Sequence, residues 1–164
     1  MRIILTFLVL FFLVLSSCMK EKEFPVEPRI AFKDFTKVII PPDSIPQLLI
    51  LSISFTDGDG DIGLDSTMID SPYDFNLFID IYKMTNGQLE TIVISGDTVN
   101  FNGRIPIVAE NPDNKPIEGV IEYNFDYSIL RSRLLNDTVA FDVSIKDRAL
   151  HQSNTIRTPL IIID

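Results

Sequence analysis

The sequence predicts an all-β protein whose strands form an antiparallel sandwich of about seven to eight strands. Three observations lead to this fold class. Several runs alternate apolar and polar residues with a period of two, turn-forming residues separate these runs, and only one short stretch has a helical pattern. A run with one apolar and one polar face is typical of a strand that buries one side and exposes the other.

Four runs carry the clearest alternation. In the first, one face is apolar and Ser52 and Ser54 lie on the other. In the second, Asn76 and Asp80 are expected to face solvent. The residues expected on buried faces are Leu49, Leu51, Ile53 and Phe55; Phe75, Leu77, Ile79 and Ile81; Ile121, Tyr123, Phe125 and Tyr127; and Val139, Phe141, Val143 and Ile145. The expected strands are 29–40, 48–55, 74–84, 89–95, 97–108, 117–127, 138–147 and 155–163.

Local signals define the connections. Asn86-Gly87 separates two apolar runs and predicts a hairpin with a type I′ turn, because both residues tolerate positive φ. Ser128–Leu135, with the sequence SILRSRLL, predicts one short helix across the end of the sandwich. Pro159 interrupts the closing run, which favours an edge strand or a bulge there.

This succession of strands and turns resembles the immunoglobulin-like pattern of fibronectin and cadherin domains. The chain has one cysteine, Cys18, and no tryptophan, so an intramolecular disulfide is impossible. The resemblance therefore implies a disulfide-free sandwich over residues 29–164.

The N-terminal sequence MRIILTFLVLFFLVLSSC has the features of a targeting segment. Arg2 is followed by an apolar run, Ile3–Leu15, that is shorter than a membrane-spanning helix needs. Leu15-Ser16-Ser17-Cys18 resembles the lipobox of bacterial lipoproteins, which implies that residues 1–17 are a signal peptide and that Cys18 carries an acyl anchor in the lipid bilayer. The alternative is an ordinary cleavage site beside a free cysteine.

Residues 18–28 are charged and contain two prolines, so they are interpreted as a tether between the anchor and the domain. The run Lys20–Glu23 loosely resembles the export signal of Bacteroidetes surface lipoproteins, although a solvated linker has the same composition. The resemblance implies an outer-membrane lipoprotein exposed at the cell surface. A net charge of −9 argues against nucleic acid as a partner.

Residues Phe55–Ser66, FTDGDGDIGLDS, form the most distinctive stretch of the chain. Asp57, Asp59, Asp61 and Asp65 alternate with glycines that allow a tight curl. Carboxylates brought this close repel one another unless a cation lies between them, and calcium is bound by several such oxygens. The sequence therefore predicts a structural calcium site, with a solvated acidic turn as the alternative.

The spacing partly resembles DxDxDG calcium loops such as EF-hands and dockerins. Ile62 stands where those loops have glycine, Met68 stands where they have the bidentate glutamate, and no helix flanks the loop. An EF-hand is excluded, so further ligands must come from elsewhere. In an immunoglobulin-like sandwich the loops after strands 48–55 and 138–147 emerge at the same end, which makes Asp147 a candidate ligand. Its alternative partner is Arg148 or another local cation. Asp70 and Asp74 are weaker candidates.

No catalytic constellation is evident in the sequence. His151, the one histidine, is interpreted as an exposed loop residue rather than a general base, and no serine or cysteine lies in a nucleophile-elbow context. The chain is accordingly predicted not to be an enzyme.

The lipobox and the DGDGDIG stretch together resemble small Bacteroidetes-type lipoproteins with an immunoglobulin-like sandwich. The resemblance implies an envelope-anchored, non-catalytic binding or structural module with a calcium-stabilised loop. One alternative is a glycan- or peptide-binding accessory of a nutrient-uptake system, using aromatic loop residues such as Tyr73. A hydrolase is the third possibility. The sequence does not identify the protein or glycan partner.

Overall fold

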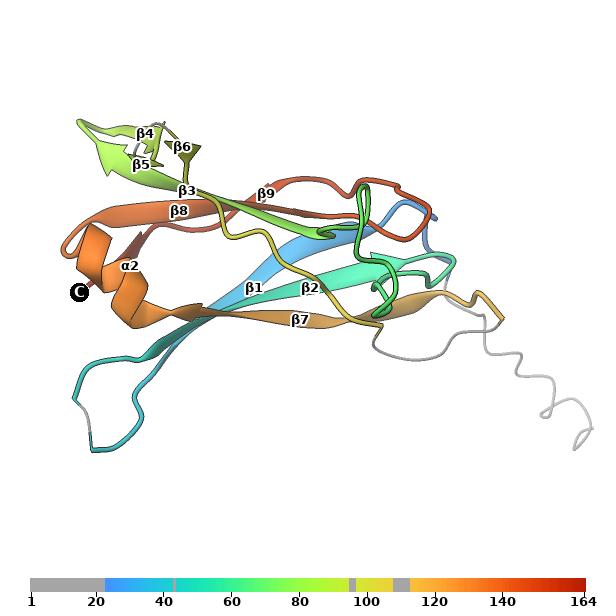
Figure 1. Cartoon of the computed structure of the whole chain (residues 1–164), viewed down its shortest axis with the longest axis horizontal. Helices are drawn as coiled ribbons and strands as arrows, with labels where there is room; N and C mark the ends of the chain where they lie inside the picture. The colour runs from blue at the N-terminus through green and yellow to red at the C-terminus, as the bar shows by residue number, and fades with distance from the viewer. Residues whose placement is uncertain (1–22, 43, 95–96, 108–112) are drawn as a thin grey trace, which may run out of the picture.

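The computed structural model describes residues 23–42, 44–94, 97–107 and 113–164, which form two antiparallel β-sheets packed face to face (Figure 1). The predicted signal peptide, Cys18 and the first part of the tether lie outside these residues. In the part of the chain that is described, no helix has the length and apolar character needed to cross a membrane.

The first sheet contains three long strands in the order β1 (Arg29–Val38), β2 (Leu48–Asp57) and β7 (Ile117–Asp126). β2 lies in the middle and pairs with β7 along its whole length and with β1 from Leu48 to Thr56. Its inward-facing residues are therefore shielded on both sides, which accounts for the nearly complete burial of Leu49, Leu51 and Ile53.

The second sheet has the order β10-β8-β3-β4, and β9 also pairs with β8. Its strands are β3 (Leu77–Thr85), β4 (Gln88–Thr91), β8 (Thr138–Ile145), β9 (Ile156–Arg157) and β10 (Ile161–Ile162). β5 (Val93–Ile94) and β6 (Asp97–Thr98) form a separate short pair. The two antiparallel sheets, of three and five strands, confirm the predicted sandwich. In immunoglobulin lettering, β2, β3 and β8 correspond to strands B, C and F.

An aromatic cluster joins the two sheets through the core. The ring of Phe125 on β7 lies 4.9 Å from that of Phe141 on β8 and 5.1 Å from that of Phe101. The Phe35 ring on β1 approaches Phe141 to 5.8 Å. Because Phe141 contacts strands of the opposite sheet and is fully buried, it is a central residue of the core.

The predicted hairpin and helix are both present. Asn86 and Gly87 have φ values of 50° and 82° in the two-residue turn between β3 and β4, as a type I′ turn requires. Helix α2 (Tyr127–Leu134) begins after Asp126, whose Oδ1 accepts hydrogen bonds from the N–H groups of Ser128 (2.9 Å) and Ile129 (3.4 Å). This side chain caps the first turn of the helix.

Four strand predictions need correction. The expected strand 89–95 is broken at Ile92 into β4 and β5, which belong to different sheets. The expected strand 97–108 is extended only at β6; beyond it, isolated bridges join Asn100 to Asp80, Gly103 to Leu77 and Pro106 to Leu64. This segment follows the edge of β3 and then crosses to the loop after β2, because proline and Asn102-Gly103 interrupt regular pairing. The closing run 155–163 is split into β9 and β10, with Pro159 between them at the sheet edge.

The last correction concerns the start of β3. The expected face included Phe75 and turned Asn76 outward, but Phe75 is 44% exposed and Asn76 is buried. The Asn76 side chain accepts a hydrogen bond from the N–H of Ile105 (2.6 Å) and donates one to its carbonyl oxygen (3.2 Å). These paired bonds compensate for the burial of the amide. β3 begins at Leu77, three residues after the expected start at residue 74.

Candidate metal centre

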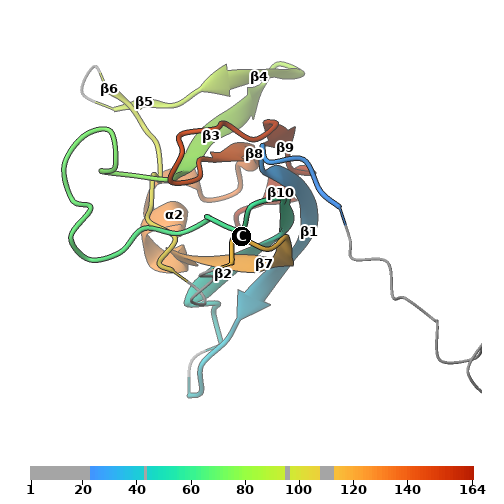
Figure 2. The same ribbon diagram turned by 90° about the vertical axis from the view of Figure 1, so that its right-hand side faces the viewer.

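Two loops and the start of the domain meet at one end of the sandwich (Figure 2). The first is the β2–β3 loop, residues 58–76, and the second is the β8–β9 loop, residues 146–155. The third is the lead-in segment, residues 23–28, which precedes β1. The immunoglobulin-like topology brings the first two loops together, because β2 and β8 run toward the same end of neighbouring sheets.

Four carboxylates converge between these loops. Asp57, Asp59, Asp61 and Asp147 each offer an oxygen, and these four oxygens all lie within 4.8 Å of one another. Asp57 is 0% exposed and Asp147 is 1% exposed. We call these residues the four-aspartate centre. The core-facing phase of Asp147, unusual for a charged residue, is explained by its place in this group.

The hydrogen bonds orient the carboxylates in a consistent way. Oδ2 of Asp57 accepts from the N–H of Asp61 (2.8 Å), and Oδ2 of Asp61 accepts from the N–H of Ala149 (3.1 Å). The Oδ1 atoms of Asp57 and Asp61 are buried and have no hydrogen-bond partner among the described residues. Buried carboxylate oxygens are rarely left in this state, so these two atoms are suited to bind a cation.

His151 holds Asp147 in place, a role that the sequence did not reveal. Its N–H donates to Oδ1 of Asp147 (2.8 Å), and its ring Nδ1 lies 2.8 Å from Oδ2. The partner of Asp147 is therefore His151 rather than Arg148. The sequence signal for this contact was the four-residue spacing between Asp147 and His151. When a loop curls back, a carboxylate can accept a hydrogen bond from the backbone N–H four residues ahead.

The backbone of the acidic loop, residues 57–65, curls where glycine permits it. Gly60, between two of the aspartates, has a φ of 65°, in the left-handed region. Arg148 joins the two loops, since its Nη1 donates to the carbonyl oxygen of Gly63 (3.2 Å) and its N–H to that of Asp61 (3.4 Å). These bonds fix the distance across which the carboxylates face one another.

Asp65 lies outside the four-aspartate centre. Its Oδ1 instead accepts hydrogen bonds from the N–H and hydroxyl of Thr67, both at 2.6 Å. Asp70 and Asp74 are exposed and are also not in the group. Arg104 organises this outer part of the loop, because its guanidinium donates to the carbonyl oxygens of Asp65, Met68, Tyr73 and Asp74.

Burial and mutual repulsion perturb the carboxylates. Burial, followed by the charges of Asp59 and Asp61, raises the pKa of Asp57 to about 6. Burial and the charge of Asp147 raise the pKa of Asp61 as well. The hydrogen bond to Asp147 raises the pKa of His151. The centre therefore favours uptake of positive charge, either as protons or as a cation.

A pH titration of the metal-free protein tests these shifts. The pKa of Asp57 is about 6 in the folded protein against an ordinary value of 3.8, so the folded state binds more protons between these pH values. The free energy of unfolding should then fall by about 2 kcal/mol as the pH rises from 4.5 to 7. His151 acts in the same direction, because a raised histidine pKa stabilises the fold only below it.

Urea unfolding in buffer freed of divalent ions measures this slope. Asp57→Asn should flatten it, and the exposed Asp80→Asn should leave it unchanged. A free energy of unfolding that rises across this window would contradict the assignment. The carboxylate of Asp164, whose bonds to Lys37 and Tyr127 lower its pKa to about 2, titrates below the window and does not interfere.

The geometry matches a hard cation of calcium size. Two oxygens bound to calcium at about 2.3–2.6 Å can lie up to about 5 Å apart, and the four carboxylate oxygens lie within 4.8 Å of one another. Comparison with protein-family models, curated proteins and solved structures finds no match to this chain.

Tyr73 does not form an open aromatic platform. It is half-buried, its hydroxyl donates to the carbonyl oxygen of Arg148 (3.2 Å), and its own carbonyl accepts from Arg104. These bonds connect the outer part of the β2–β3 loop to the β8–β9 loop. Tyr73 therefore supports the end of the domain that carries the four-aspartate centre.

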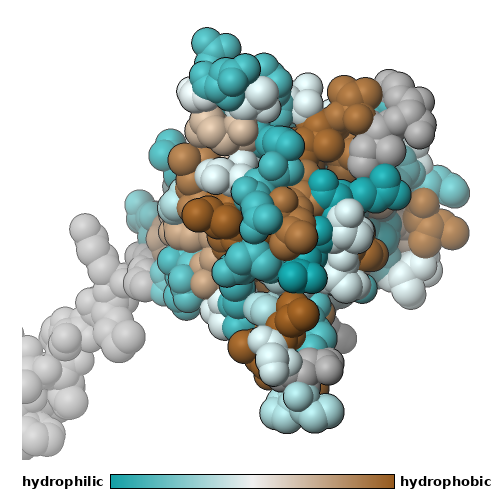
Figure 3. Space-filling view, turned by 90° about the vertical axis from the view of Figure 1, so that its left-hand side faces the viewer, coloured by the Kyte–Doolittle hydropathy of each residue, from teal (hydrophilic) through white to brown (hydrophobic). Residues whose placement is uncertain are grey.

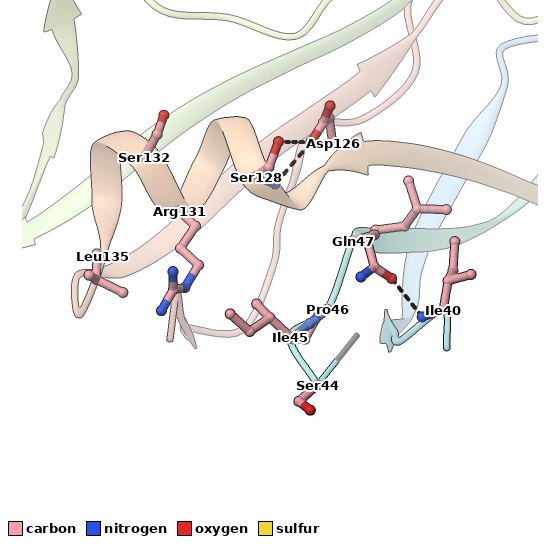
Figure 4. Close-up of a pocket in the computed structure, with 11 residues that line it drawn as sticks. Ile40, Ser44, Ile45, Pro46, Gln47, Asp126, Ser128, Arg131, Ser132 and Leu135 are labelled. Atoms are coloured by element: carbon pink, nitrogen blue, oxygen red, sulfur yellow. Dashed lines mark hydrogen bonds between the residues drawn. The ribbon is translucent and has the colours of Figure 1, made fainter. Parts of the chain in front are cut away.

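A groove of about 910 Å³ lies at the opposite end, between α2 and the connection from β1 to β2. Figure 3 faces this end and shows several apolar patches on it, with hydrophilic residues between them. In Figure 4, Arg131 of α2 and Leu135, which follows the helix, face Ile45 and Pro46 of the connection. Arg131 donates from Nε to the carbonyl oxygen of Asp164 (3.2 Å), and its terminal nitrogens have no partner in the described parts of the chain.

Proposed function

We propose that this protein is a non-catalytic binding or structural module of the bacterial cell envelope, anchored through an acylated Cys18 and stabilised by calcium in the four-aspartate centre. The observation that supports the metal site best is the Oδ1 atom of Asp57, which is buried with no hydrogen-bond partner among the described residues and belongs to a group of four converging carboxylates. An ion there would satisfy this atom and offset the repulsion within the group.

Calcium fits the donor set better than other common metals. All four candidate ligands are carboxylates, which are hard oxygen donors, whereas zinc and copper sites use histidine or cysteine. His151 contacts Asp147 and thereby orients a ligand, in the manner typical of residues just outside a metal's coordination sphere. Magnesium tolerates such dense carboxylate cages less well, because it retains several of its waters.

The structural role follows from where the ligands lie. Three are on the acidic loop and the fourth is on the β8–β9 loop, so one ion would cross-link the loops that follow strands β2 and β8. Cross-linking these loops would pre-organise this end of the sandwich for a partner. Attachment to the envelope is supported by the lipobox-like sequence Leu15-Ser16-Ser17-Cys18.

Titration calorimetry with calcium tests the metal site. We expect one calcium ion per chain, and we expect Asp59→Asn and Asp147→Asn to weaken binding at least tenfold. Asp65→Asn is the matched control, because it changes a carboxylate of the same loop that lies outside the centre. Absence of binding to the native protein would overturn the proposal, as would equal losses in the Asp65 and Asp59 variants.

A second candidate function is the binding of a peptide or glycan in the groove beside α2. The supporting observation is Arg131, whose terminal guanidinium nitrogens no described residue occupies and which lines the groove beside apolar residues such as Ile45 and Leu135. In an envelope-anchored protein this groove would lie at the end of the domain away from the tether. Mutation of Arg131 to alanine should weaken binding of an acidic peptide from a screened panel. Arg133→Ala is the control, because Arg133 lies on the same helix but does not line the groove.

A further inference from the structure

The lead-in segment lies directly against the acidic loop. A Cβ atom added to Gly58 would lie 2.4 Å from the carbonyl oxygen of Phe24 and 2.6 Å from that of Pro25. Gly58 does not have a positive φ, so its own backbone conformation would accept a side chain. Glycine is required here because another part of the chain passes too close. That contact falls between two residues of the metal centre, Asp57 and Asp59.

The other end of the lead-in segment is fixed to the opposite loop. Pro28 is buried, and Ile30 follows it as the second residue of β1. The N–H of Ile30 donates to Oδ1 of Asn154, and Nδ2 of Asn154 donates to the carbonyl oxygen of Ile30, both at 2.9 Å. Asn154 belongs to the β8–β9 loop, which also carries Asp147. The segment thus runs between the two loops that supply the metal ligands.

We propose that calcium in the four-aspartate centre clamps the lead-in segment, so that occupancy of the site sets where the folded domain ends and the membrane tether begins. This rests on the proposed function, namely that the centre binds calcium. Without the ion, four close carboxylates repel and the acidic loop spreads. The surface around Gly58 then moves, and residues 23–28 lose the surface on which they lie.

The clamp would change the reach of the anchored domain. Residues 23–28 are six in number and would add about 20 Å of extended chain to the tether when released. A calcium-loaded domain would therefore stand closer to its anchor and reorient less. Linkage also requires the reverse effect: if calcium fixes the lead-in segment, the docked segment must raise calcium affinity by the same factor.

Hydrogen–deuterium exchange of the intact protein with and without calcium tests the clamp. We expect calcium to slow exchange of the amides in residues 23–27 by at least about fivefold, the lower end of ordinary coupling between sites. Gly58→Ala should abolish this slowing and weaken calcium binding by a similar factor, because its methyl group displaces the segment. Gly87→Ala is the control for a strained backbone far from the centre: its φ is 82°, but no described atom lies within 4 Å of its Cβ position, so calcium should still slow exchange in residues 23–27.

Calorimetry on the same samples separates the two proposals. If calcium does not bind the native protein, the proposed function fails. If calcium binds and protects the acidic loop and the β8–β9 loop while exchange in residues 23–27 is unchanged, the clamp is wrong and the metal site stands. If Gly58→Ala prevents calcium binding altogether, exchange of residues 23–27 in the native protein with and without calcium still tests the clamp.

Discussion

Removal of calcium is expected to lower the melting temperature of the protein by about 10 °C. An ion present at about one hundred times its dissociation constant stabilises the folded state by about 2.7 kcal/mol. For a domain of this size, each kcal/mol corresponds to about 3–4 °C. The measurement is a thermal melt in EDTA and again with excess calcium, followed by circular dichroism.

Asp57→Asn gives the sharpest version of this experiment, because it should act in opposite directions on the two states. In EDTA the variant should melt above the native protein, since it removes a buried charge whose pKa is raised to about 6. In calcium it should melt below the native protein, because the ion loses a ligand. Asp80→Asn should leave both melts unchanged. Equal melting temperatures of the native protein in EDTA and in calcium would contradict the metal site.

Phe141→Ala is expected to destabilise the domain by about 3–5 kcal/mol whether calcium is present or absent. Phe141 is 0% exposed, and its ring lies 5.8 Å from Phe35 of β1 and 4.9 Å from Phe125 of β7, both in the opposite sheet. Truncation would leave a cavity where the two sheets meet. Urea unfolding measures the loss.

Phe35→Ala provides the graded control for this prediction. Phe35 belongs to the same aromatic cluster but is only partly buried, so its truncation should cost less than that of Phe141. Equal losses at the two positions would show that Phe141 does not have the central place in the core that its contacts indicate. A loss at Phe141 that appears only without calcium would contradict the independence of core and metal site.

The regular strands were predictable because their signal is local. The alternation in residues 48–55 and 138–147 identified β2 and β8, and Asn86-Gly87 identified the hairpin turn, since a period of two and a positive-φ turn are properties of neighbouring residues. The segment 97–108 was predicted wrongly because its conformation depends on partners far along the chain. Its bridges to Asp80, Leu77 and Leu64 are tertiary contacts that composition does not encode.

In the candidate metal centre, too, the residues with a local sequence signal were predicted and the tertiary contacts were not. The alternating aspartates and glycines indicated Asp57, Asp59 and Asp61 as ligands, and the strand order of the fold class indicated Asp147. The spacing equally included Asp65, which the structure assigns to a hydrogen-bonded turn with Thr67. The contact of His151 with Asp147 was not predicted, because one histidine in a loop has no periodic pattern.

By itself, the sequence determined the fold class and the acidic character of one loop, because both arise from residue order over short distances. Only the tertiary structure decided which carboxylates converge, which of their oxygens are buried with no partner in the described parts of the chain, and why Gly58 must be glycine. These properties depend on segments that are distant in sequence, namely residues 23–28, 57–65 and 146–155. Packing of the two sheets brings these segments within a few ångströms of one another. Because of that proximity, the acidic loop is a candidate metal site.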